Sequence, residues 1–210
     1  IRDDDELVVV RRVDEGDEVI MVSRAGLTVR FAESDVRAMG RDTSGVRGMD
    51  VGPQGEVIAM DVARDDQELL VVTKNGYGKR TRIDQYRKTS RGAKGVKTIG
   101  LTESKGELGG ALVVREHQEL VFISQDGLVQ RTAVRGISQQ GRAATGVRVM
   151  NVREGDQVSA VALVVESESQ DAESTAAEME TGQAPESLEP PESLEPSESL
   201  EPPEAPESQE

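Results

Sequence analysis

A repeat of about fifty residues runs through most of this 210-residue chain and limits the folds that it can adopt. Gly26, Gly76 and Gly127 are spaced by 50 and 51 residues, and the same spacing relates three sets of basic residues. These sets are Arg30, Arg80 and Arg131; Arg41, Arg91 and Arg142; and, each after a Gly-Val pair, Arg47, Lys97 and Arg148. Such register across three copies indicates repeated units that bury their cores against one another.

Each copy predicts four short strands, because apolar and polar residues alternate and β-branched residues are frequent. The first two strands form hairpins, VIMVS with LTVRF, LLVVT with YGKRTRI, and LVFIS with LVQRTAV. Asn75-Gly76 and Asp126-Gly127 favour tight type I′ turns, in which both central residues have a positive φ. A polar connection follows each hairpin. A third strand is expected to begin at each Gly-Val pair, and a fourth covers EVIAMDVA, GALVV and VSAVALVV.

Four strands every fifty residues predict an all-β fold of propeller blades, which pack face to face around an axis. We expect three blades at residues 14–64, 65–115 and 116–166, together residues 14–166. Residues 1–13, with the apolar run LVVV, are expected to form the last strand of an earlier blade. Further blades would then precede this sequence, since three alone make an unclosed ring.

The acidic excess of the chain belongs to its C-terminal tail. The net charge is −15, but residues 167–210 hold 14 acids and no base, which leaves 26 acids and 25 bases for residues 1–166. The tail also holds seven of the eight prolines and repeats the hexapeptide PESLEP. Such a composition buries too little apolar surface to offset the entropy of ordering, so residues 167–210 are predicted to be a disordered acidic tail.

Catalysis and metal binding find little support in the residues. The chain has no cysteine, and its one histidine, His117, lies in the polar stretch REHQE, where a surface residue is expected. The run from Asp3 to Glu6 lacks the spaced ligands of a calcium loop. We therefore expect no catalytic residue, metal site or cofactor in this chain. No apolar run is long enough to span a bilayer and the first residues lack a signal-peptide pattern, so a cytoplasmic protein with no membrane partner is expected.

The basic residues suggest a polyanion as the partner. Residues 73–99 hold nine lysines and arginines against one acid, Asp84. If the repeats are blades, their bases line up along one edge, which suits the phosphates of duplex DNA. The alternative for Arg30, Arg80 and Arg131 is a structural ion pair between blades. The candidate DNA contacts are Arg30, Arg41, Arg47, Lys79, Arg80, Arg82, Arg87, Lys88, Arg91, Lys94, Lys97, Arg131, Arg142 and Arg148.

Base-edge readout is not expected, because the chain shows no recognition helix and no aromatic residues interleaved with the bases. Backbone contact without sequence preference fits duplex DNA bent around a convex rim. The open alternative is a propeller that serves as a protein-interaction scaffold, whose basic surface binds an acidic partner or the tail of the same chain.

The repeats SRAGLTVRF, TKNGYGKRTRI and SQDGLVQRTAV, with their GRDTSGVRGM, SRGAKGVKTI and GRAATGVRVM connections, resemble the C-terminal DNA-wrapping domain of the bacterial DNA gyrase A subunit. The topoisomerase IV domain is a close relative. The resemblance implies a β-pinwheel, a propeller whose blades exchange strands, and a role in wrapping duplex DNA. The partners that it implies are a second A subunit, the gyrase B subunit and DNA. It further implies a bacterial, nucleoid-associated location, with ATP and Mg in the complete enzyme.

One departure from this family concerns its box Gln-Arg-Arg-Gly-Gly-Lys-Gly. Residues 89–95 (TSRGAKG) match that box at four of seven positions, and residues 140–146 (QGRAATG) at three. Both resemble the degenerate counterparts found in later blades. The resemblance places an intact box, the catalytic tyrosine and the breakage-reunion domain of a type II topoisomerase upstream of Ile1. It implies negative supercoiling at the expense of ATP as the activity of the whole enzyme.

Overall fold

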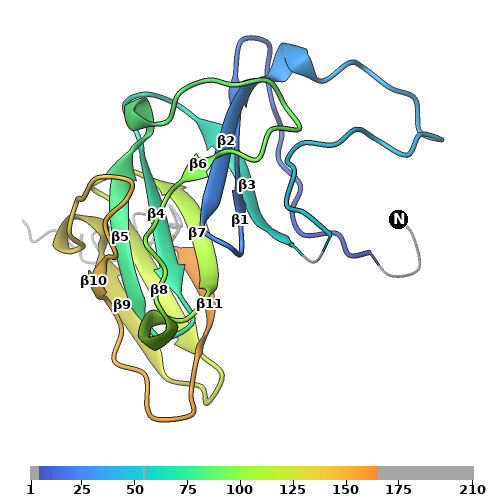
Figure 1. The fold of residues 1–210 in the computed structure, drawn as a ribbon. Helices are drawn as coiled ribbons and strands as arrows, with labels where there is room; N and C mark the ends of the chain where they lie inside the picture. The colour runs from blue at the N-terminus through green and yellow to red at the C-terminus, as the bar shows by residue number, and fades with distance from the viewer. Residues whose placement is uncertain (1–4, 54, 165–210) are drawn as a thin grey trace, which may run out of the picture. The chain divides into compact units, whose positions relative to one another are not determined.

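Three antiparallel sheets make up the fold of the computed structural model, which describes residues 5–53 and 55–164. The first sheet has the strand order β3-β1-β2-β6, the second β10-β5-β4-β7, and the third β11-β8-β9 (Figure 1). The described residues contain short 3-10 turns but no α-helix, and the predicted all-β fold is confirmed. The expected tail, residues 167–210, lies outside the described residues.

The strands are β1 (Glu18–Ser23), β2 (Leu27–Ala32), β3 (Val57–Ala63), β4 (Glu68–Thr73), β5 (Tyr77–Arg82), β6 (Val96–Lys97), β7 (Leu108–Val114), β8 (Glu119–Ser124), β9 (Val129–Ala133), β10 (Val147–Arg148) and β11 (Val158–Leu163). The predicted hairpins are the pairs β1-β2, β4-β5 and β8-β9, and the predicted fourth strands are β3, β7 and β11. A 3-10 turn follows each hairpin, at Glu33–Asp35, Ile83–Gln85 and Val134–Gly136.

The hairpin loops differ from the expected two-residue turns. In the second hairpin the loop holds three residues, from Lys74 to Gly76, and the amide of Gly76 donates to the carbonyl oxygen of Thr73 at 3.0 Å. Gly76 adopts a positive φ, 78°. The same bond joins Gly26 to Ser23 in the first hairpin. Glycine is suited to this third loop position because it adopts positive φ without steric cost.

The predicted third strands cross from one repeat to the next. Strand β6 belongs to the second repeat but pairs with β2 of the first, and β10 of the third repeat pairs with β5 of the second (Figure 1). Each crossing strand has only two residues. Residues 45–51, expected to form a strand in the first repeat, adopt none, and neither do residues 5–13. A strand forms only in a ladder with a second strand, and within the described residues neither segment has one, although residues 48 and 50 make single backbone hydrogen bonds to residues 92 and 93.

Apolar side chains fill the spaces between successive sheets. Ile20 and Val22 of the first sheet pack with Leu69 and Val71 of the second. On the other face of the second sheet, Leu70 and Val72 pack with Leu120 and Phe122 of the third. Successive residues of a strand point to opposite faces, so a run such as LLVV buries one sheet between two others.

Candidate nucleic-acid interface

The polar connections of successive repeats lie side by side. The amide of Asp50, at the end of the first connection, donates to the carbonyl oxygen of Ala93 in the second at 3.0 Å. One repeat later, Gly100 donates to Ala144 in the same way at 3.1 Å. These bonds bring together the segments that carry most of the basic residues. We define the basic strip as eight residues on these segments: Arg41, Arg47, Arg87, Lys88, Arg91, Lys94, Lys97 and Arg142.

Most of the basic strip faces solvent with its charge uncompensated. Among residues 5–53 and 55–164, six members of the strip donate no side-chain hydrogen bond and form no ion pair. Arg142 is half-buried, and the other five are exposed: Arg41, Arg47, Arg87, Lys94 and Lys97. Lys88 forms an ion pair with Glu18 of the preceding repeat. Charges in water that are not paired within the protein are available to the phosphates of a polyanion.

Arg91 links the second connection to the first through hydrogen bonds of its guanidinium. Its Nε donates to the carbonyl oxygen of Asp35 at 2.8 Å, and its Nη1 donates to that of Arg47 at 3.2 Å. Both acceptors lie in the first connection, so the half-buried Arg91 fastens the second connection to it. Its repeat equivalent Arg142 is also half-buried.

Two members of the strip from different repeats share one hollow. Lys97 and Arg142 line an open depression of about 480 Å³ together with Gln85 and residues 141, 143 and 144. The lining carries no acid. A hollow with two cations and an amide offers donors on several sides, which is the arrangement that a phosphate group requires.

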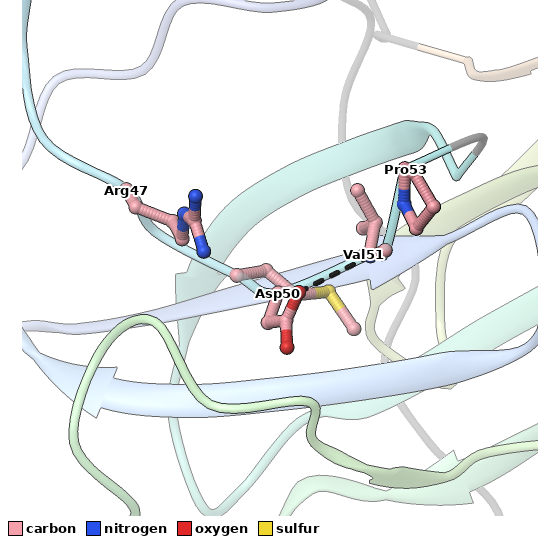
Figure 2. A pocket seen from close by; sticks show the side chains of 6 residues that line it. Arg47, Asp50, Val51 and Pro53 are labelled. Carbon is pink, nitrogen blue, oxygen red and sulfur yellow. Dashed lines mark hydrogen bonds between the residues drawn. The ribbon is translucent and has the colours of Figure 1, made fainter.

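The hollow at the first connection has a different charge balance. Figure 2 shows Arg47 and Asp50 on its wall, together with Val51 and Pro53, in a volume of about 330 Å³. The Asp50 carboxylate accepts a hydrogen bond of 3.2 Å from the amide of Gly52, drawn as the dashed line (Figure 2). Because this wall holds one acid and one base, it attracts an anion less than the hollow of Lys97 and Arg142.

Three of the expected DNA contacts lie inside the protein. Arg30 and Arg80 are only 4% and 7% exposed, and Lys79 is fully buried. Arg80 forms an ion pair with Glu68 at 2.6 Å, and Arg30 pairs with Glu18 and, at 2.7 Å, with Asp65. The structural alternative therefore fits Arg30 and Arg80, and neither these two nor Lys79 presents its charge to a polyanion.

Lys79 is buried against the third connection. Its ammonium donates to the carbonyl oxygens of Gly141 at 2.5 Å and Arg142 at 2.9 Å, and to the hydroxyl of Thr81 at 3.2 Å. Burial, and next the positive charge of Arg142, lower the pKa of Lys79 to about 8. These hydrogen bonds satisfy the buried ammonium group within the protein, so a lysine at this position needs no phosphate as a partner.

The remaining expected contacts are exposed but already engaged. Arg82 pairs with Asp84 at 2.5 Å, and Arg131 pairs with Glu119 of its own hairpin. Arg148 donates to the Tyr77 hydroxyl at 2.6 Å, and its guanidinium lies 4.8 Å from the centre of the Tyr77 ring. The connection residues thus form one strip, whereas Arg82 and Arg131 of the hairpins and Arg148 of β10 are engaged with other side chains.

A further repeated feature explains the buried arginines. Glu18, Glu68 and Glu119 recur at 50 and 51 residues, each twelve residues before the arginine it contacts. In the hairpin register Leu70 lies opposite Arg80, so Glu68 is its diagonal neighbour across the two strands. A carboxylate that repeats with the arginine is the signal by which the sequence could have separated an ion pair from a phosphate contact.

Two other features are absent from the described part of the chain. Within it, no three His, Cys, Asp or Glu side chains are grouped to hold a metal ion. No helix there has the length and apolar character needed to cross a membrane.

Comparison with known proteins gives a consistent result. The DNA gyrase A subunit of Mycolicibacterium smegmatis is 39% identical over 89% of this chain, and that of Staphylococcus aureus is 38% identical over 89%. The chain spans 22% of each of these relatives, about a fifth of their length. A solved DNA gyrase A C-terminal domain matches 73% of this chain and 52% of its own, with a TM-score of 0.68 and 28% identity.

A second solved structure, the C-terminal domain of DNA topoisomerase IV, matches 87% of this chain and 57% of its own, with a TM-score of 0.75. Its identity is 22%, so this likeness concerns the fold. The model of the DNA gyrase C-terminal domain, beta-propeller family matches residues 17–64, 67–115 and 118–164, which is more than half of the chain. The chain therefore belongs to the DNA gyrase C-terminal domain family, and its sheets are blades of that beta-propeller.

Proposed function

We propose that this chain binds duplex DNA through the basic strip, without sequence preference, and wraps it as the C-terminal part of a gyrase A subunit. The observation that carries the proposal is the row of exposed bases on adjacent connections that have no partner within the described residues. Phosphate contacts of this kind supply affinity and position but do not read bases. DNA that follows the strip crosses from one repeat to the next, so it would have to bend with the sheets.

In this proposal the chain contributes DNA binding to a type II topoisomerase that introduces negative supercoils. That larger assembly also holds a second A subunit, the gyrase B subunit, and the ATP and Mg that the whole enzyme uses. Its place is the bacterial cytoplasm, with the nucleoid. The identity of the relatives and the family support this assignment.

The test is a filter-binding titration of the 210-residue chain with two unrelated duplexes over a range of salt concentrations. The variant Arg87→Gln, Lys94→Gln, Lys97→Gln removes three charges that have no partner in the described residues. We expect weaker binding of both duplexes to the same degree. The slope of log K against log salt should become less steep by about 0.9 for each phosphate contact removed.

A matched control removes the same charge elsewhere, with Arg12→Gln, Arg115→Gln and Arg153→Gln. These residues are exposed, and Arg115 lies beside Asp65, Asp66 and Glu116. Net charge alone would weaken both variants equally. Equal losses, or unchanged binding in the strip variant, would contradict the proposed interface.

A further inference from the structure

The two junctions between neighbouring connections are held by different side chains. Arg91 holds the first junction, because its guanidinium donates to the carbonyl oxygens of Asp35 at 2.8 Å and Arg47 at 3.2 Å. Its equivalent at the second junction is Arg142, 51 residues further on. The Arg142 guanidinium donates no hydrogen bond and forms no ion pair within residues 5–53 and 55–164. Other groups must therefore hold the third connection in place.

Two side chains of β5 hold the third connection from the protein interior. The hydroxyl of Thr81 donates to the carbonyl oxygen of Gln140 at 2.8 Å. The Lys79 ammonium donates to the next two carbonyl oxygens, that of Gly141 at 2.5 Å and that of Arg142 at 2.9 Å. These last two carbonyl groups flank the Cα atom of Arg142. Lys79 therefore fixes the backbone of Arg142 and leaves its guanidinium available to a ligand.

The first hairpin lacks this interior donor. Val29 occupies the position of Lys79, 50 residues earlier, and is buried in an apolar cluster with Met49. A valine side chain cannot donate to a carbonyl group, and at that junction Arg91 makes the hydrogen bonds. Of the two junctions, the second is the one at which an interior lysine makes these bonds in place of the arginine.

Arg142 lines the hollow of about 480 Å³ that it shares with Lys97 and Gln85. One wall of this hollow is a tight turn, in which the amide of Ala144 donates to the carbonyl oxygen of Gly141 at 3.1 Å. The amides of the two central residues of the turn donate to no acceptor in the part of the chain that the structure describes. Two cationic side chains and an amide side chain therefore meet beside main-chain donors.

The first junction is less suited to an anion. The residues that there replace Gln85, Lys97 and Arg142 are Asp35, Arg47 and Arg91. An acid thus stands in place of the neutral Gln85, and the guanidinium of Arg91 is already bonded to carbonyl groups. The second junction has the larger uncompensated positive charge, which favours a phosphate group.

We propose that the hollow of Lys97 and Arg142 binds one backbone phosphate of duplex DNA, and that Lys79 positions Arg142 for this contact. The inference rests on the proposed DNA binding and names the place where one phosphate is held. Lys79 does not touch the phosphate itself, because its ammonium is buried and bonded to carbonyl groups. Among the described residues it makes no hydrogen bond to the segments that carry Arg87 and Lys94, so those contacts should not depend on it.

The charges of Lys79 and Arg142 act on each other. Burial, and next the positive charge of Arg142, lower the pKa of Lys79 to about 8. The other titratable group of this buried region is Tyr86, whose pKa is raised by burial, so it stays neutral in this pH range. Within the described residues no acid pairs with Lys79. A phosphate on Arg142 would offset the repulsion and raise the pKa of Lys79, so DNA should bind more weakly once Lys79 has lost its proton.

The test is a double-mutant cycle on the 210-residue chain, with a short duplex of arbitrary sequence as the probe and fluorescence anisotropy as the readout. The variants are Lys79→Met, Arg142→Gln and their combination. Each single variant should weaken binding by about two- to fivefold, the range for one exposed charge pair. The combination should bind no more weakly than Arg142→Gln alone, because Lys79 acts through Arg142. In a Lys94→Gln background, the matched control, the loss from Lys79→Met should appear in full.

A second measurement does not need a folded Lys79 variant. The affinity of the wild type for the duplex should fall as pH rises from about 7.5 to about 9.5, and that of Arg142→Gln should fall less. Circular dichroism checks that both proteins stay folded over this range. An equal fall in both would show that the proton on Lys79 does not act through Arg142, and would overturn the positioning role.

The remaining outcomes separate this inference from DNA binding itself. A folded Lys79→Met protein that binds like the wild type, or a loss that is as large in the Arg142→Gln background, would also overturn the positioning role. Wild-type affinity in Arg142→Gln would overturn the phosphate site, while a loss in Arg87→Gln, Lys94→Gln would leave the proposed function standing. A wild-type chain that does not bind the duplex at all would overturn both.

Discussion

Arg80 Nε donates a hydrogen bond of 2.7 Å to the carbonyl oxygen of Ile137, which lies one repeat further along the chain. The same guanidinium pairs with Glu68 of its own hairpin at 2.6 Å. Arg30 binds Tyr86 in the corresponding way at 3.2 Å. One arginine in each of these hairpins therefore joins two repeats, and its buried charge is neutralised by the glutamate beside it.

Removing the Arg80 side chain should strongly destabilise the folded protein. Arg80→Ala leaves the buried Glu68 without its ion-pair partner and removes the donor to the carbonyl oxygens of Arg135 and Ile137, so we expect the free energy of unfolding to fall by about 3–5 kcal/mol. Arg131→Ala removes an exposed pair and should cost about 1 kcal/mol or less. Urea unfolding followed by circular dichroism measures both. Similar losses for the two variants would show that the contacts to the next repeat add nothing.

Lys79 should make the free energy of unfolding depend on pH in the alkaline range. Its pKa is about 8 in the folded protein against 10.5 for an ordinary lysine, so the unfolded chain binds more protons between these values. The Lys79 contribution to the free energy of unfolding should therefore rise as pH increases from about 8 towards 10, and stay constant below that window. The measurement is the difference in unfolding free energy between wild type and Lys79→Met at several pH values. A difference that does not change with pH would contradict the lowered pKa.

The exchanged strands predict an unequal cost for two glycine substitutions. Gly95→Ala and Gly45→Ala place a side chain at a similar positive φ, which costs each about 1–2 kcal/mol. Gly95→Ala also brings a Cβ to 2.4 Å from the carbonyl oxygen of Thr28, so it should destabilise the protein more and loosen β6 from β2. Thermal unfolding of the two variants, measured on dilute protein, gives the comparison. Equal shifts in Tm would argue against close packing at Gly95.

Residues 167–210 should compete with DNA for the basic strip. They carry 14 acids and no base, and negative charge on a linked segment is drawn to exposed cations. Deleting them should raise the affinity for duplex DNA at low salt, and the gain should shrink as salt screens the attraction. Filter binding of the truncated and full chains tests this. An affinity that is unchanged or lower after deletion would rule out competition by the tail.

The local elements of the fold could be predicted from the residues, because their causes are local. Alternation, β-branched residues and loop glycines predicted the three hairpins and the apolar strands β3, β7 and β11. The Gly-Val segments were predicted as strands within their own repeats, but β6 and β10 pair with the hairpins of the preceding ones. Two residues of strand carry no sequence pattern of their own, and the choice of partner depends on packing between distant segments.

The candidate site shows the same division between local and distant causes. The connection bases were expected at one edge, and the bonds from Asp50 to Ala93 and from Gly100 to Ala144 bring them together. Lys79 and Arg80 were expected beside them, because a count of charges in residues 73–99 does not distinguish the two faces of a strand. Their acceptors are mainly backbone carbonyl oxygens of residues some 60 positions away, such as Gly141 for Lys79, and a carbonyl group leaves no trace in a sequence.

Strand exchange also determines which fragments of the protein keep complete sheets. The unit that repeats in the sequence and the sheet that forms in space are out of phase, since β6 and β10 lie in sheets built by the residues before them. A cut before residue 65 therefore removes β6 from the first sheet, and a cut before residue 116 removes β10 from the second, while the sheets that follow each cut stay complete. Unfolding of one repeat should consequently spread backwards along the chain, from the donor of a strand to its acceptor, more readily than forwards.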